Sequence, residues 1–165
     1  MKKDGPWTSG PRELLEHAKD HLAKATDVDN RFAMISVDNA VELMLTTYLR
    51  LPRGVTGLDL TRKQQEEHTK GFLSALTAIH RLVGDRLSAV PLAEVEWFHQ
   101  IRNQLYHEGN AITVERDKVK LYLEHAELLM RCLYGGQSGT PHYYGGLFDL
   151  AEQSESSRGK KAGPP

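Results

Sequence analysis

The amino-acid sequence predicts an all-α protein, an up-and-down bundle of four to five helices that ends in an irregular C-terminal tail. Three observations lead to this prediction. Apolar residues recur at helical spacing along five separate stretches of the chain. Gly, Pro or a capping residue stands at most of the boundaries between those stretches. No stretch alternates convincingly between apolar and polar residues as a half-buried strand does, and 165 residues suit one domain with its own core.

The first two predicted helices form the N-terminal half of the bundle. Residues 1–10 contain Gly and Pro and predict a flexible lead, and Pro11 suits the first position of a helix. The apolar stripe of that helix consists of Leu14, Leu15, Ala18, Leu22 and Ala25. Capping residues in 26–30 precede a second helix, which is the most apolar segment and ends at Pro52. Its length and composition predict the central helix of the bundle.

Three polar residues, Asp38, Asn39 and Glu42, interrupt the apolar run of this second helix. Burying a polar group without a partner is costly. We therefore expect these side chains to face water, a partner molecule or a functional site.

Three further helices are predicted after the loop that follows Pro52. Residues 60–84 predict one helix with a polar first half and an apolar second half, ended by Gly84. Residues 92–109 predict the fourth helix, and residues 115–136 predict a fifth. The core stripe of the fifth consists of Val119, Leu123, Ala126, Leu129, Met130 and Leu133. The bundle is thus expected over 11–135, and the Gly-, Ser- and Pro-rich residues 136–165 predict a partly disordered tail.

The charge balance excludes some classes of protein. Lys and Arg total 21 against 22 for Asp and Glu, and the formal net charge is −1. Proteins that bind nucleic acid by charge alone are usually strongly basic, so any contact with RNA here requires a local positive patch and a shaped site. Binding to anionic membranes is not expected. Cys132, the single cysteine, excludes an intramolecular disulfide. A cytoplasmic protein is the expectation.

The fourth helix carries the residues with the clearest chemical potential, in "IRNQLYHEGN", residues 101–110. At helical spacing one arc is apolar and a second is polar. The apolar arc holds Val95, Phe98, Ile101 and Leu105, and the polar arc holds Glu96, His99, Asn103 and His107. Arg102 falls at the edge of the apolar arc, where a guanidinium must reach toward water, pair with a carboxylate or be held for use.

Arg102, Asn103 and His107 suit the cleavage of RNA without a metal ion. In that reaction the ribose 2′-hydroxyl loses a proton and attacks its own phosphorus, and histidine can take up protons near neutral pH. Arginine can hold the extra negative charge of the phosphorane, and an amide can orient the histidine or a phosphate oxygen. One histidine per chain supplies a base, and two chains facing each other would supply an acid as well. Alternatively, His107 has no catalytic role and is only part of the helix end at "HEG", residues 107–109.

The stretch "IRNQLYHEG" resembles the signature of the HEPN superfamily, in which an Arg is followed by a polar residue, often Asn, and by a His four to six positions beyond the Arg. Arg102, Asn103 and His107 match these three places. "DNAVELMLTTYL", residues 38–49, looks like the helix that the family places earlier in its bundle. The resemblance covers roughly residues 12–134.

The resemblance implies a HEPN-like helical bundle that forms a homodimer, with the two motifs facing each other across a cleft. Many members are metal-independent ribonucleases that act as toxins of toxin–antitoxin pairs or in antiphage defence. Arg102 and His107 would then be catalytic and Asn103 the supporting polar residue, with RNA as substrate. We expect no cofactor and no metal ion, and a separate antitoxin protein is a candidate partner.

Two other interpretations are open. The chain could be a non-catalytic HEPN module that binds a nucleotide or a separate partner protein, or an inert helical dimer whose motif satisfies an interface. His17 and His21 lie one helical turn apart and could present two nitrogens to a metal ion. Because no "HExxH" pattern accompanies them and lysines flank them, a solvated helix face is the favoured interpretation.

Overall fold

The computed structural model describes residues 6–107 and 113–135, and every regular element in these ranges is a helix. The prediction of an all-α fold is confirmed for them. In chain order the elements are α1 (Pro6–Lys24), α2 (Asp27–Arg50), α3 (Arg53–Thr56), α4 (Arg62–His68), α5 (Phe72–Val83), the short 3-10 helix η1 (Gly84–Leu87), α6 (Leu92–His107) and α7 (Arg116–Tyr134). Residues 136–165, for which an irregular tail is predicted, lie outside the described ranges.

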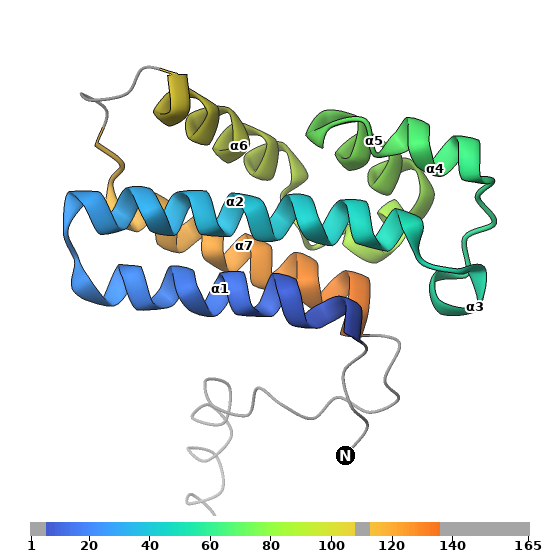
Figure 1. Ribbon diagram of the computed structural model, residues 1–165, viewed down its shortest axis with the longest axis horizontal. Coiled ribbons are helices and arrows are strands. Elements are labelled where there is room, and N and C mark those ends of the chain that lie inside the picture. The colour runs from blue at the N-terminus through green and yellow to red at the C-terminus, as the bar shows by residue number, and fades with distance from the viewer. Residues whose placement is uncertain (1–5, 108–112, 136–165) are drawn as a thin grey trace, which may run out of the picture.

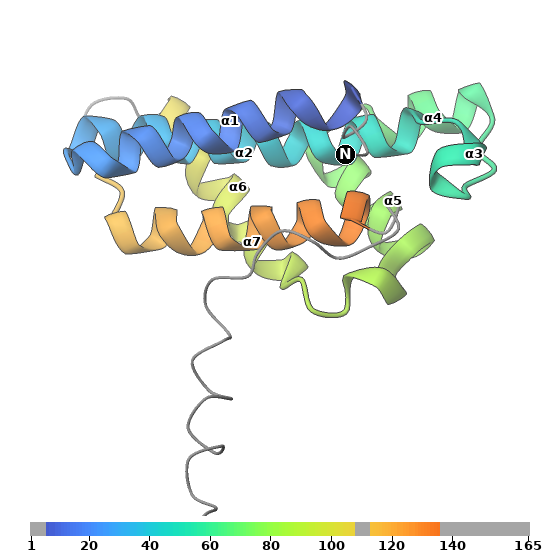
Figure 2. The same cartoon turned by 90° about the horizontal axis from the view of Figure 1, so that it is seen from below.

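Helix α2 is the centre of the bundle, as predicted. It runs antiparallel to α1, and α7 packs against both of them (Figures 1 and 2). On its other side α2 contacts α5 and α6. Twelve of its 24 residues are buried, which agrees with contacts on several sides. Because α2 contacts helices on several sides, a polar residue in its interior lies at the junction of those helices.

The predicted helix over residues 60–84 is wrong in one respect, since two helices occupy this stretch. Helix α4 begins with a capping box in which Thr61 and Gln64 exchange hydrogen bonds, and it buries no residue. Gly71 has an extended backbone and separates α4 from the apolar helix α5. Helix α4 is polar and has no apolar face that could continue the packing of α5. The chain therefore turns between the two helices instead of forming one long helix. The short α3 lies in a stretch that was predicted to be a loop.

The ends of α1 also differ from the prediction. The helix begins at Pro6, earlier than the predicted start at Pro11, and Trp7 and Thr8 pack against the core. Burial of these two residues favours the additional turn. Ala25, predicted to belong to the apolar stripe, is exposed and has a φ of 59°. It is the link between α1 and α2 and takes no part in the core.

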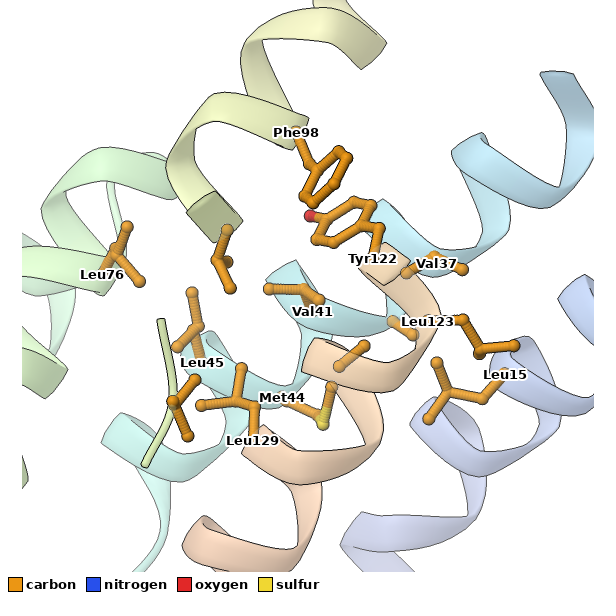
Figure 3. Close-up of a cluster of buried hydrophobic side chains, with 14 of the residues drawn as sticks. Leu15, Val37, Val41, Met44, Leu45, Leu76, Phe98, Tyr122, Leu123 and Leu129 are labelled. Carbon is orange, nitrogen blue, oxygen red and sulfur yellow. The ribbon is translucent and has the colours of Figure 1, made fainter. Parts of the chain in front are cut away.

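The core consists mainly of aliphatic side chains, with several aromatic ones, from α1, α2, α5, α6 and α7 (Figure 3). Within it the rings of Phe98 and Tyr122 stack with their centroids 4.7 Å apart. The predicted stripes of the fourth and fifth helices are confirmed, except that Ile101 and Met130 are only partly buried. In the described ranges no helix has the length and apolarity needed to cross a membrane.

Candidate functional site

The site is built around Asp38, a carboxylate with no exposed surface in the middle of α2. Donors from two other helices converge on it. The hydroxyl of Tyr122 in α7 donates to Oδ1 at 2.8 Å, and Nδ1 of His99 in α6 lies 3.0 Å from Oδ1 and 3.1 Å from Oδ2. Arg102, also in α6, forms an ion pair in which its Nε lies 3.2 Å from Oδ2. Asp38 therefore joins α2, α6 and α7 through one buried charge.

Among the described residues, Asp38, Asn39 and Asn103 hold Arg102 in place. Besides the ion pair with Asp38, its Nη2 donates to Oδ1 of Asn39 at 2.8 Å and its Nη1 donates to Oδ1 of Asn103 at 3.1 Å. About a fifth of the side chain, 19%, stays exposed. Of the three outcomes that the sequence leaves open for this residue, pairing with a carboxylate is the one that the structure shows. The guanidinium is fixed in one orientation at the surface of the bundle.

His99 lies between the aromatic ring of Phe72 and the polar residues of the site. The two rings are parallel within 1°, with centroids 3.6 Å apart. On its far side, Nε2 of His99 lies 3.1 Å from Nδ2 of Asn103, one turn later in α6. Only 12% of the side chain of His99 is exposed. The ring is thus held by α2, by α5 and by its own helix.

Tyr122 is a permanent donor to the site. Burial raises the pKa of its hydroxyl well above the ordinary value, and the negative charge of Asp38 raises it further. The hydroxyl therefore keeps its proton at physiological pH and continues to stabilise the carboxylate.

The structure brings together two of the three predicted site residues, Arg102 and Asn103. His107 is the last residue of α6, and its side chain lies outside the described part of the structure. Asn103 was expected to share the space of His107, but the partners described for it are Arg102 and His99. The amide thus orients the arginine in this structure.

Sequence reasoning missed His99 as a member of the site and left Asp38 and Asn39 without a role. Asp38 and Asn39 stood out as polar residues in the most apolar helix, with water, a partner molecule or a functional site as the expected surroundings, and the structure places both at the site. Glu42, the third of that group, has no hydrogen bond or ion pair through its side chain among the described residues. The signal for His99 was its place one turn before Asn103, but its pairing with Asp38, 61 positions away, has no local signature.

The described residues contain no group of three His, Cys, Asp or Glu side chains suited to a metal ion, so none of them completes a metal centre with His17 and His21. His21 is 14% exposed and pairs with Asp29 at 2.7 Å, so a solvated face is wrong for this residue. The reason is that the start of α2 packs against it. Nδ1 of His17 lies 3.2 Å from the hydroxyl oxygen of Ser36.

No protein-family model, curated protein or solved structure matches this chain. Its resemblance to the HEPN superfamily therefore stays a prediction, carried by the residues of the site.

Proposed function

We propose that this protein is a metal-independent endoribonuclease of the HEPN type that cleaves RNA at a cleft between two copies of the chain. A role as a toxin or in antiphage defence, with a separate antitoxin protein, follows from the resemblance. The observation that supports an enzyme most strongly is that Asp38, Asn39 and Asn103 hold Arg102 in place near the end of α6. Donors fixed in place before the reaction stabilise developing charge better than mobile ones, because they need no reorganisation.

The proposed reaction uses Arg102, Asn103 and His107 as follows. A histidine accepts the proton of the ribose 2′-hydroxyl, whose oxygen attacks the adjacent phosphorus. The bond from phosphorus to the 5′-oxygen breaks, and a second proton donor protonates that leaving oxygen. The products are a 2′,3′-cyclic phosphate and a 5′-hydroxyl. The guanidinium of Arg102 stabilises the phosphorane, and Asn103 supports Arg102 through the hydrogen bond to its Nη1.

A homodimer agrees with an apolar stripe on the outer face of α2. Val28 and Phe32 are each 50% exposed and Leu43 is 38% exposed. Asn39, which binds Arg102, lies four residues before Leu43 and seven after Phe32, so it belongs to the same face of the helix. Exposed apolar residues beside a polar site are typical of an interaction surface. In the proposed dimer a second copy binds on this stripe, and its own His107 is the second proton-transferring group.

The experiment is an RNA-cleavage assay on the purified chain in the presence of EDTA. We expect cleavage by the wild type, a loss of about 100-fold or more in Arg102→Lys, and a similar loss in His107→Ala. Lys keeps the positive charge of Arg102 but not its forked geometry, so Asp38 retains a cation. Arg62→Ala and His80→Ala, which change exposed residues of α4 and α5, are the matched controls and should cleave as the wild type does.

The same assay distinguishes a non-catalytic interaction module, which the apolar stripe on α2 also favours. Such a module would bind RNA or a partner protein through the face around Asn39 without producing a cyclic phosphate. Cleavage that depends on a divalent ion, or that persists in His107→Ala, contradicts the proposed enzyme.

A further inference from the structure

Four side chains of the site form a closed ring of polar contacts, and only two of them have a part in the proposed chemistry. The ring runs from Asp38 to His99, from His99 to Asn103, from Asn103 to Arg102 and from Arg102 back to Asp38. The four links measure 3.0, 3.1, 3.1 and 3.2 Å. Three of its members lie within five consecutive positions of α6, and the fourth is buried in α2.

The chemistry of the ring determines where each proton lies. A guanidinium only donates, so the atom of Asn103 that faces Arg102 is the amide oxygen. The NH2 group of Asn103 then faces Nε2 of His99, which must accept. A histidine that accepts at Nε2 is neutral and carries its proton on Nδ1, the nitrogen that faces the carboxylate of Asp38. The carboxylate of Asp38 only accepts, so it also requires a proton on Nδ1 of His99.

The charges of the ring agree with this assignment. Asp38 and Arg102 balance each other, and a neutral His99 keeps the buried group at zero net charge. A second proton on His99 would place an N–H against the NH2 group of Asn103 and add a second positive charge beside Arg102. Stacking on Phe72 holds the imidazole in plane, so its two nitrogens stay directed at Asp38 and Asn103.

We propose that His99 is a positioning residue, which stays neutral with its proton on Nδ1 and turns the amide of Asn103 so that the amide oxygen holds Arg102. Asp38 keeps the proton of His99 on Nδ1, so Nε2 is left as an acceptor for the NH2 group of Asn103. The amide oxygen of Asn103 then faces Arg102 and accepts from its Nη1. The catalytic consequence rests on the proposed function, whereas the tautomer does not.

The first test reads the tautomer directly and needs no RNA. Nitrogen-15 chemical shifts of the His99 imidazole are measured by NMR in the folded wild type near neutral pH, with His99→Gln as the variant that assigns the signal. We expect a proton on Nδ1 and an unprotonated Nε2. A proton on Nε2, alone or together with one on Nδ1, overturns the proposal even if the protein cleaves RNA.

The second test distinguishes the roles of the two ring nitrogens of His99 with a matched pair of variants. His99→Asn keeps a donor near the Nδ1 position, and His99→Gln keeps an acceptor near the Nε2 position; both lose the ring that stacks on Phe72. We expect kcat for RNA cleavage to fall about tenfold further in His99→Asn than in His99→Gln, with similar KM values. Circular dichroism confirms that both variants are folded.

Equal kcat values in the two variants, or a lower value in His99→Gln, overturn the role of the acceptor at Nε2. If the wild type does not cleave RNA, the proposed function fails. The NMR measurement still decides whether His99 has the proposed tautomer.

Discussion

Asp38 shows how a single residue can organise the site. A carboxylate with no exposed surface loses its hydration, and that loss is offset only when charged and polar partners surround it. Tyr122, His99 and Arg102 provide these partners from α7 and α6. The same contacts that stabilise the buried charge place Arg102 at the surface. Stability and the arrangement of the site therefore depend on one side chain.

Replacing Asp38 by Asn should destabilise the protein by about 3 kcal/mol, because the positive charge of Arg102 is left partly buried without its partner. The measurement is the free energy of unfolding in urea. The control is Asp38→Asn in an Arg102→Met background, which has no arginine charge for the Asp38 carboxylate to balance. There the cost of Asp38→Asn should fall by at least about 1 kcal/mol. Equal costs in the two backgrounds would show that the ion pair contributes little.

At the scale of elements, the start of α2 is stabilised by a small polar cluster. Thr26 is the N-cap and accepts from the backbone N–H of Asp29, and its hydroxyl donates to the Asp29 carboxylate at 2.6 Å. His21 of α1 lies 2.7 Å from the same carboxylate. The hydrogen bond from Thr26, then that from His21, lowers the pKa of Asp29. The cluster links the end of α1 to the beginning of α2.

This lowered pKa predicts a pH-dependent contribution to stability. A carboxyl whose pKa is lower in the folded protein stabilises the fold above its unfolded pKa of about 3.9, and the contribution is lost as the pH falls through the folded value. Asp29→Asn should therefore lower the Tm near neutral pH. The difference from the wild type should shrink below about pH 4. A difference in Tm that stays constant over this range would contradict the assignment.

The link between α1 and α2 contains a strained residue, since Ala25 has a positive φ. Glycine adopts this conformation without the steric penalty of a Cβ. Relief of a penalty of about 1–2 kcal/mol exceeds the extra chain entropy of glycine, about 0.5–1 kcal/mol, so Ala25→Gly should stabilise the protein by about 0.5–1 kcal/mol in urea unfolding. Gly57, the other described residue with a positive φ, is the inverse control, and Gly57→Ala should destabilise the protein by a similar amount. Destabilisation by Ala25→Gly would contradict this account.

At the scale of the whole molecule, the proposed site needs two copies of the chain, because each copy supplies one motif. Sedimentation velocity should show a dimer, and cleavage per chain should fall on dilution as the monomer becomes populated. Leu43→Glu, on the apolar stripe of α2, should shift the protein to a monomer and lower cleavage. Leu121→Glu changes a similarly exposed leucine of α7 and should have neither effect. A monomeric wild type that cleaves RNA would exclude the shared cleft.

The sequence by itself determined the helical class, the central place of α2 and the apolar faces of α6 and α7. These features follow from the spacing of apolar residues, which is local and can be counted along the chain. It also singled out Arg102, because a guanidinium at the edge of an apolar arc requires a partner, and Asn103, because the motif resembles the HEPN signature. The break at Gly71 and the earlier start of α1 were not predicted, since both depend on which faces find a surface to pack against.

Only the tertiary structure decided which side chains meet in the site. Asp38 lies 61 positions from His99 and 84 from Tyr122, and no local pattern connects them. These contacts arise because α6 and α7 both pack on α2, so that their side chains reach the same buried carboxylate. The sequence contained every residue of the ring, but packing determined the tautomer of His99 and the orientation of Arg102.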